Sequence, residues 1–324
     1  MPPERSKTRA ARADVAGTRA ERHVLSLVRF LAQSPEAVYD AWLDRDALGR
    51  WLFRTPGGAL ASAEVDPRRG GDFTIVETRG NSQAPHFGRY VTLERPRSLA
   101  FTFAVDRTQA PSNVKIALTP LHQGTVLTVQ HEVEARWAEY APMILAGWSR
   151  MLASLSAHLS LEAQGALSVS TLVEAPRAEV WQAWTTPDGL ARWWGGADAP
   201  RPEVEQMQVA PGGGFRLRIA GPQGQSFLVR GTYRDVVPDE RLVYDDVCEV
   251  DGRPFYEELL EVALAPAGKA QTLLTVTAPL APAVRQQPEA MLDDLRIGWA
   301  RGWADNLDAL SATFAAQRQT RSGG

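Results

Sequence analysis

Segments of period-two hydrophobicity alternate with segments of helical period along the chain, and the whole order occurs twice. Residues 23–32 (HVLSLVRFLA) are rich in Val, Leu and Phe and predict a strand. Two short helical segments follow in 34–53, starting at a capping Ser34 and Pro35. Apolar and polar residues then alternate over 61–133 with a turn every 8 to 12 residues. This pattern predicts a meander of antiparallel strands.

A long amphipathic segment closes each half of the pattern. Apolar residues recur three and four positions apart over about 140–162, and again over about 288–316. Each sheet must bury one face, and the long helix offers the large apolar surface that can cover it. We therefore predict an α+β protein of two tandem domains. Each is a curved antiparallel sheet wrapped around a long C-terminal helix, with two short helices after the first strand.

The duplication is visible in two 20-residue stretches. Residues 34–53 read SPEAVYDAWLDRDALGRWLF, and residues 175–194 read APRAEVWQAWTTPDGLARWW. Superposing Trp184 on Trp42 also places Trp193 on Trp51, which indicates that a whole domain was duplicated.

The predicted boundaries follow from these patterns and from composition. They are a tail at 1–22, domain 1 at 23–162, domain 2 at 166–316 and a tail at 317–324. The basic, alanine-rich first segment is typical of a solvated, disordered tail, and the alternatives are an RNA-contacting arm or a targeting peptide.

Composition narrows the class of protein. The 324 residues are 44% hydrophobic and 23% charged, with a formal net charge of −3. This balance provides no field that would attract nucleic acid or an anionic membrane. No apolar run reaches the roughly 20 residues that span a bilayer. The single cysteine, Cys248, cannot form an internal disulfide, which fits the reducing cytoplasm. We expect a cytoplasmic protein with neither nucleic-acid binding nor membrane insertion.

Motifs for metal, phosphate or nucleophilic chemistry do not occur in the sequence. The five histidines include no i,i+4 pair and no neighbouring cysteine, so we expect no metal site. The glycines at 212–214 lead into a strand and predict a hairpin turn, not a phosphate cradle. We expect no cofactor. We also expect His131 to lie at the surface at a strand end, and Cys248 to be an inert packed thiol.

Ten tryptophans, many of them in the second domain, suggest either an aromatic lining for a flat ligand or core packing. For Trp184, Trp193 and Trp299 we favour core packing. Trp181 and Trp303 are the better candidates for a cavity wall, because domain 1 has only Tyr39 at the first position and no aromatic residue at the second.

Two acidic residues interrupt apolar strand faces in the second domain. Asp246 lies within the inward pattern of 242–250, and Glu258 within that of 256–264. If the hairpin turns at Gly252, these carboxylates become inward-facing neighbours across the strands, and one proton is held above its usual pKa. Such a pair suits acid–base chemistry or capture of a cationic or hydroxylated ligand. A bulge would instead place both acids in water. In domain 1 the position of Asp246 is occupied by Phe103.

These patterns together resemble a known family. The run A-P-x-x-x-V-W-x-A-W-T-x-P-x-x-L-x-x-W-W, the glycine-rich turn, the stretch 231–244 and the closing Gly-Trp helix are similar to the AHSA1-like branch of the START/Bet v 1-like (SRPBCC) superfamily. The resemblance covers about 24–160 and 166–316. It implies a helix-grip fold with an internal pocket, and one member of the branch activates the Hsp90 ATPase.

We therefore expect a binding protein rather than an enzyme, with a small hydrophobic or amphipathic ligand held chiefly in domain 2. One alternative is a cyclase, dehydratase or hydrolase that uses Asp246 and Glu258. The other is a regulator of a chaperone or ATPase, with that protein as partner. The residues that we predict to contact the ligand are Trp181, Trp194, Phe215, Phe227, Tyr233, Tyr244, Asp246, Cys248, Tyr256, Glu258, Trp299 and Trp303.

Overall fold

A computed structural model describes residues 22–322 except 56, 122–123, 198, 222–223 and 269. The first domain runs in the order β1 (Arg22–Leu31), α1 (Pro35–Asp40), α2 (Arg45–Trp51), β2 (Ala59–Val65), β3 (Asp72–Arg79), β4 (Ser82–Glu94), β5 (Ser98–Ala104), β6 (Ser112–Leu121), β7 (Gly124–Glu134), a 3₁₀ turn (Ala135–Tyr140) and α3 (Ala141–Gln164). The expected tail at 1–22 lies outside the described residues except for Arg22, which begins β1.

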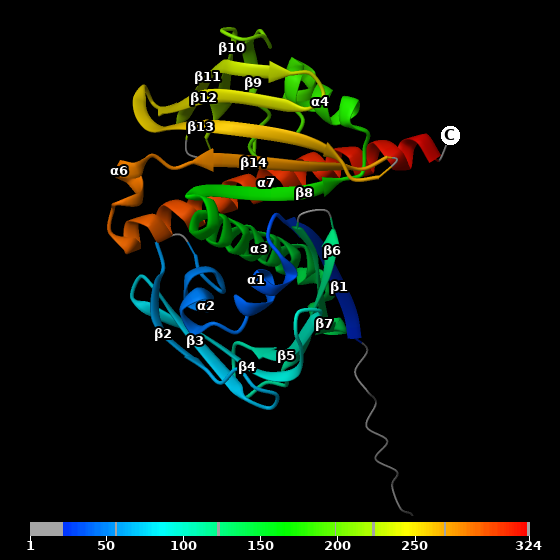
Figure 1. Ribbon diagram of the computed structural model, residues 1–324, viewed down its shortest axis with the longest axis vertical. Helices are drawn as coiled ribbons and strands as arrows, with labels where there is room; N and C mark the ends of the chain where they lie inside the picture. Colours follow the sequence, from blue (N-terminus) through cyan, green and yellow to red (C-terminus); the bar gives the residue numbers. More distant parts are fainter. Residues whose placement is uncertain are drawn as a thin grey trace, which may run out of the picture.

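The second domain repeats this order (Figure 1). Its elements are β8 (Ala166–Val173), α4 (Arg177–Thr185), α5 (Pro187–Leu190), β9 (Glu203–Met207), β10 (Gly214–Ala220), β11 (Ser226–Val237), β12 (Arg241–Val250), β13 (Arg253–Pro266), β14 (Thr272–Pro279), α6 (Pro282–Arg285) and α7 (Glu289–Ser322). Helix α7 continues past 316, so the expected tail from 317 is helical as far as Ser322. One reason is that the Arg318 guanidinium donates a hydrogen bond of 2.5 Å to the Glu174 carbonyl.

Both sheets are seven-stranded and antiparallel, as predicted. The strand orders are β1-β7-β6-β5-β4-β3-β2 and β8-β14-β13-β12-β11-β10-β9. Each first strand therefore pairs with the last, and the remaining strands follow as consecutive hairpins. This topology leaves the two short helices to cross from the first strand of the sheet to the strand at its far edge.

The short helices begin at residues that can cap them. The side chains of Ser34 and Asp44 accept hydrogen bonds from the backbone N–H groups three residues later, and Thr186 does the same for α5. These bonds satisfy amide groups that the first turn of a helix leaves without a partner.

Conserved packing in the two copies explains the repeated tryptophans. The Trp51 indole donates to the Ala41 carbonyl, and the Trp193 indole donates to the Ala183 carbonyl, ten residues earlier in each case. Trp42 and Trp184 contact these indoles at ring distances of 4.7 and 4.5 Å. The four side chains are buried, so the repeated motif packs the short helices against the sheet.

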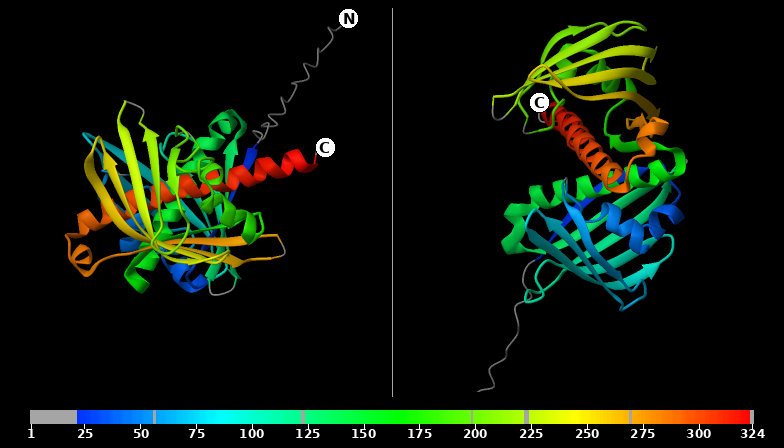
Figure 2. Two further views of the ribbon diagram at one scale, coloured as in Figure 1. Left: turned by 90° about the horizontal axis from the view of Figure 1, so that it is seen from above. Right: turned by 90° about the vertical axis from the view of Figure 1, so that its left-hand side faces the viewer.

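The two long helices, α3 and α7, lie side by side between the two sheets (Figure 2). Helix α3 presents small side chains to its partner, and Ala153 and Ala157 join the hydrophobic core of the second domain. Small residues let two helices approach closely. The helix of domain 1 therefore also forms part of the core of domain 2.

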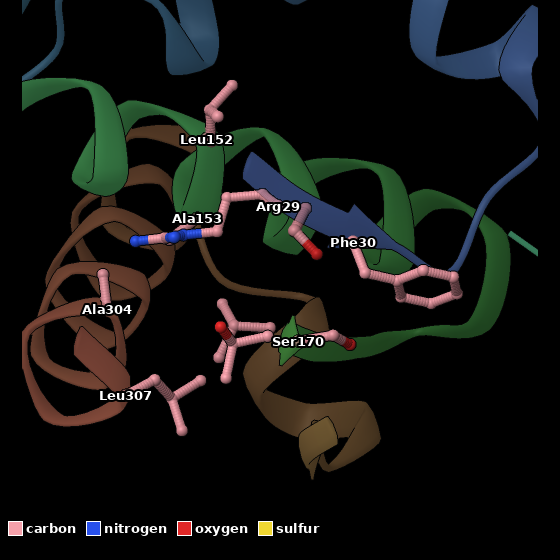
Figure 3. A pocket seen from close by; sticks show the side chains of 10 residues that line it. Arg29, Phe30, Leu152, Ala153, Ser170, Ala304 and Leu307 are labelled. Atoms are coloured by element: carbon pink, nitrogen blue, oxygen red, sulfur yellow. The ribbon is translucent and has the colours of Figure 1, made fainter. Parts of the chain in front are cut away.

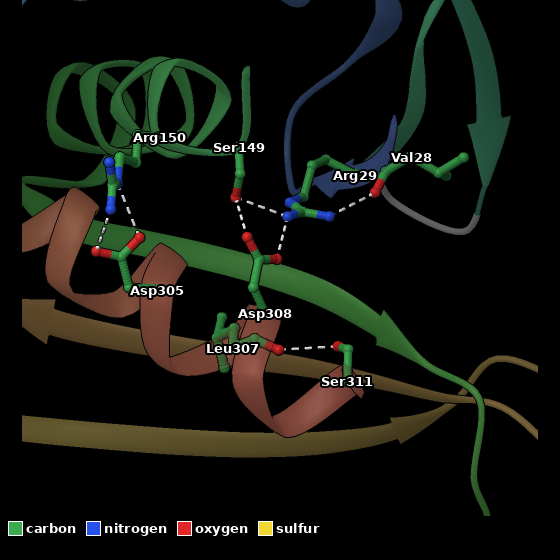
Figure 4. Close-up of polar contacts among 8 residues, drawn as sticks. All are labelled: Val28, Arg29, Ser149, Arg150, Asp305, Leu307, Asp308 and Ser311. Atoms are coloured by element: carbon green, nitrogen blue, oxygen red, sulfur yellow. Dashed lines mark hydrogen bonds and ion pairs between the residues drawn. The ribbon is translucent and has the colours of Figure 1, made fainter. Parts of the chain in front are cut away.

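Ion pairs fix the contact between the helices (Figure 4). The buried Arg29 guanidinium donates to the carboxylate of Asp308, which also accepts a hydrogen bond of 2.5 Å from Ser149. Beside them Arg150 binds Asp305 in a bidentate pair at 2.8 and 3.1 Å. These contacts join residues from β1, α3 and α7.

Candidate functional site

The site centres on two strands of the second domain. Asp246 on β12 lies directly opposite Glu258 on β13. The hairpin turns at Asp251 and Gly252, which adopt φ values of 50° and 75°. A register shift occurs between Cys248 and Glu249, closer to the turn than the acidic pair. The predicted cross-strand pairing is therefore confirmed, and the bulge does not place Asp246 in water.

The two carboxyl groups have different surroundings. Asp246 is 1% exposed, and neither of its carboxylate oxygens accepts a hydrogen bond from a described residue. Glu258 is half-buried and accepts a hydrogen bond of 2.8 Å from the Trp299 indole on α7. Burial and the neighbouring Glu258 raise the pKa of Asp246 well above its ordinary value. Burial raises the pKa of Glu258 to about 7, against a smaller lowering by the Trp299 hydrogen bond.

Further polar groups of the second domain face this pair. The Tyr244 side chain is buried, and its hydroxyl has no partner among the described residues. Burial and the nearby Asp246 raise the pKa of Tyr244 and raise that of the Cys248 thiol to about 11. The Cys248 thiol is therefore neutral at neutral pH, and its inertness stays a prediction. Tyr256 is 38% exposed and lies between the buried pair and the surface.

The other predicted ligand contacts lie mostly in the core. Trp303 is buried and stacks on Trp184 with ring centroids 5.9 Å apart and planes 12° apart. Trp194, Phe215 and Tyr233 are also buried and contact one another or their neighbours. These rings pack the fold. Trp181 and Phe227 are partly buried against the same core, and a ligand contact for any of these side chains stays a prediction.

The first domain has a different set of residues at the equivalent end of its sheet. Phe103 pairs with Gly88 as Asp246 pairs with Gly231, so the two positions correspond, as the repeat indicates. Aromatic rings fill this end: Phe53 stacks on His86 at 4.2 Å and on Phe103 at 5.1 Å. Among the described residues of domain 1, no carboxyl group occupies the position that corresponds to Asp246.

His131 belongs to this aromatic set, and the prediction that it lies at the surface is wrong. It is 5% exposed because it faces α3 across the sheet, where the Trp148 indole donates to its Nδ1 at 3.2 Å. An indole can only donate, so Nδ1 is the acceptor, and Nε2 carries the proton that contacts Ser112 Oγ at 2.7 Å. Burial lowers the pKa of His131 to about 4. This tautomer cannot accept the Ser112 proton through Nε2, so the pair is no nucleophile and base.

Two hollows lie elsewhere among the described residues. One, between the domains, has about 10 Å³ of space and lies beside Arg29, Ala153 and Leu307 (Figure 3). That is room for about one water molecule and no larger ligand. The other is an open cleft of about 470 Å³ formed by α4, α5 and the last turns of α7. Asp246 lines neither.

The sequence predictions do not include two features of this arrangement, the glycine at position 195 and the contact of Arg29 with Asp308. Gly195 stands where Phe53 fills domain 1, one position after the Trp194–Leu52 mismatch of the aligned repeats. Both positions have positive φ, 57° for Phe53 and 95° for Gly195. Extending the repeat alignment by one residue beyond 194 would have found this difference. The partnership of Arg29 with Asp308 had no comparable signal.

Within the part of the chain that the structure describes, no group of three or more His, Cys, Asp or Glu side chains could hold a metal ion. No described helix is long and apolar enough to cross a membrane.

A match to a known protein family accounts for both domains. The profile of the activator of Hsp90 ATPase homolog 1-like (AHSA1) family matches residues 32–160 and 174–315, once in each domain. The chain belongs to the AHSA1-like family. Each matched segment covers the short helices, six strands of the sheet and most of the long helix of its domain, whereas the first strand, β1 or β8, precedes it.

Solved structures similar to the chain include single-domain and longer proteins. An AHSA1-like protein from Aeromonas hydrophila is 23% identical, with 44% of this chain and 94% of that chain covered and a TM-score of 0.38. Protein CV1439 from Chromobacterium violaceum is 23% identical, with 46% and 96% covered and a TM-score of 0.36. DynU16, of the dynemicin biosynthetic locus, is 16% identical, with 90% and 98% covered and a TM-score of 0.35. No curated protein matches the chain.

Proposed function

We propose that the second AHSA1-like domain binds a small hydrophobic or amphipathic molecule, with Asp246 and Glu258 as the polar contacts. One observation carries the proposal: a carboxyl group that is 1% exposed lacks a hydrogen-bond partner among the described residues. Buried polar groups are normally paired, and an unpaired one costs stability of about 1–3 kcal/mol. A ligand that donates a hydrogen bond to Asp246 would offset this cost.

The first domain serves a structural role in this proposal. Its equivalent position holds Phe103, and its buried histidine His131 already has partners at both ring nitrogens. Its helix α3 contributes Ala153 and Ala157 to the core of domain 2. Domain 1 therefore supports the binding domain and takes no ligand of its own at this end.

An enzymatic role is the second candidate. The pKa of Glu258, at about 7, is in the range that suits a general acid or base at neutral pH. Asp246 beside it would hold the shared proton. This candidate uses the same two residues, so binding has to be established first. We place either activity in the cytoplasm, which fits the single buried cysteine.

The test is a thermal-shift screen of lipids, aromatic compounds and amines against the full chain and two variants. Asp246→Leu removes the buried carboxyl, and Asp188→Asn alters an exposed carboxyl on α5. Compounds that raise the Tm of the full chain are expected to act on Asp188→Asn equally and to lose about tenfold or more in affinity for Asp246→Leu. Equal binding to the Asp246 variant would contradict the proposal. So would a screen without any stabilising compound, together with native mass spectra of the protein from its own host that show no bound molecule.

A further inference from the structure

We propose that the molecule bound in domain 2 is a small organic cation, an amine with an apolar body, whose ammonium group pairs with Asp246 and Glu258. This inference rests on the proposed function and narrows it to a chemical class. Three features carry it: the charges around the pair, the aromatic rings beside it, and the apolar stripe of α7 that leads to it.

The side chains that lie beside the pair on β12, β13 and α7 are acidic or neutral. Tyr244 and Cys248 lie on β12 with Asp246, Tyr256 lies on β13 with Glu258, and α7 contributes the Trp299 indole. None of the groups that shift the pKa of Asp246 or Glu258 is a cation among the described residues. A buried and a half-buried carboxyl group without a counter-charge are complementary to a positive ligand.

Two arginines of the neighbouring strand β11 lie on the opposite face of the sheet and already have partners. Arg234 pairs with Asp245, and Arg230 binds Glu249 at 2.6 Å. Since side chains alternate along a strand, Asp245 and Arg230 point away from the face of Asp246. These arginines therefore neutralise outer carboxylates and leave the inner pair without a partner.

Three aromatic residues complete the contacts for an ammonium group. Tyr244, Tyr256 and Trp299 are neighbours of the carboxyl pair. The faces of such rings attract cations, more strongly when water is excluded. An ammonium can also donate to the free oxygens of Asp246 and to the second oxygen of Glu258. An anionic ligand would be repelled here, and a purely apolar one would leave the carboxyl oxygens unsatisfied.

The apolar body has a surface to lie on. Met291 and Leu295 are 60% and 41% exposed, and they precede Trp299 by two turns and one turn on the same face of α7. An exposed apolar stripe thus leads to the half-buried indole that holds Glu258. An amine that is oriented with its charge inward would cover this stripe with its apolar part.

Binding of a cation is coupled to protons. In the free protein the raised pKa values mean that the pair keeps at least one proton near pH 7. A cation favours the ionised forms, so binding releases protons and tightens as the pH rises from about 6 to 8. A neutral ligand that bonds to the protonated pair would show the opposite pH dependence.

The experiment compares three probes that share one apolar body: 2-(1-naphthyl)ethylamine, 2-(1-naphthyl)ethanol and 3-(1-naphthyl)propanoate. Calorimetry on the full chain is run at pH 7 in phosphate and in Tris, which have different ionisation enthalpies. We expect the amine to bind about tenfold or more tightly than the alcohol, with proton release, and the propanoate not to bind. Asp246→Asn and Glu258→Gln are each expected to reduce the preference for the amine about tenfold, whereas Asp188→Asn keeps it.

Circular dichroism establishes which variants are folded. If Asp246→Asn does not fold, the result for Glu258→Gln decides the test. The amine inference is overturned if the alcohol binds as tightly as the amine, or if neither carboxyl variant changes the preference. If the alcohol binds and Asp246→Leu abolishes that binding, the proposed function stands while the amine inference fails. If none of the three probes binds, the amine inference fails, and the outcome of the wider screen decides the proposed function.

Discussion

Different side chains occupy the same end of the sheet in the two domains. In domain 1 the rings of Phe53, His86 and Phe103 stack on one another and close the interior. In domain 2 the position of Phe103 carries Asp246, with Glu258 opposite. A duplicated fold can thus keep its packing in one copy and carry buried polar groups in the other, because the buried tryptophans of the short helices contribute to the core in both.

The backbone at the edge of this region shows the same contrast. Phe53 occupies the left-handed region at φ 57°, where a side chain is strained, whereas Gly195 reaches φ 95° without that strain. Domain 1 tolerates the strained residue because its ring packs against His86 and Phe103. Domain 2 has no side chain there. The two domains therefore differ in side-chain volume at Phe53 and Gly195, and in charge at Phe103 and Asp246.

The largest effect is expected when the charge of domain 2 is copied into domain 1. Phe103→Asp removes the ring stacked on Phe53 and places a carboxyl at a partly buried position among aromatic rings, without Glu258 to share its proton. We expect a loss of about 3–5 kcal/mol in the free energy of unfolding at pH 7. Urea unfolding measures it. Val105→Asp, at a position 58% exposed, is the control and should cost less than about 0.5 kcal/mol. Equal effects of the two changes would mean that the aromatic end of domain 1 is not packed as described.

The contact between the domains is tested by two aspartates of α7. Asp308→Ala leaves Arg29 buried without its carboxylate and is expected to cost about 2–4 kcal/mol. Asp305→Ala breaks the more exposed pair with Arg150 and should cost no more than about 1 kcal/mol. Thermal unfolding of the full chain compares them. A larger loss for Asp305→Ala would show that Arg29 does not depend on α7.

The buried pair should make the stability of domain 2 depend on pH. The pKa of Glu258 is raised from 4.5 to about 7, so folding favours its protonated form. Stability is therefore fully present below pH 4.5 and falls as the pH rises through 7. Glu258→Gln should reduce this dependence, of which the part due to the raised pKa of Asp246 remains, and should stabilise the free protein by about 1–3 kcal/mol at pH 8, with no gain at pH 4. Urea unfolding at both pH values measures it, with the exposed Glu257→Gln as control. A wild-type stability that is flat over this range would exclude the buried charge.

The smallest expected effect tests the glycine at the edge of the site. A Cβ at Gly195 would meet the Ala199 Cβ at 2.9 Å and would occupy the left-handed region. Gly195→Ala is therefore expected to cost about 1 kcal/mol. Gly298→Ala lies in the interior of α7 with open space around it and should stabilise by about 0.5–1 kcal/mol. Thermal melts of the two variants should shift in opposite directions, and shifts of the same sign would contradict this account of Gly195.

Much of the candidate site could be predicted because hairpin pairing and strand alternation are local properties. The alternation of apolar residues places Asp246 and Glu258 on the buried face. The two-residue turn at 251–252 would by itself pair Asp246 with Glu257, and the register shift beside Cys248 moves Glu258 opposite Asp246. The surface prediction for His131 failed for the converse reason. Its burial depends on Trp148, which reaches it from a separate helix, and a strand pattern contains no information about that helix.

The sequence by itself determined the repeated architecture of this protein, because hydrophobic periodicity is a local property and every segment occurs in two copies. It also determined that the copies differ at Phe103 and Asp246. Only the tertiary structure decided how the domains share their helices: Arg29 meets Asp308 across 279 positions of sequence, and α3 gives Ala153 to the core of domain 2. Such contacts depend on shape and charge between segments that are distant in sequence and meet only in the folded chain, and no local period records them.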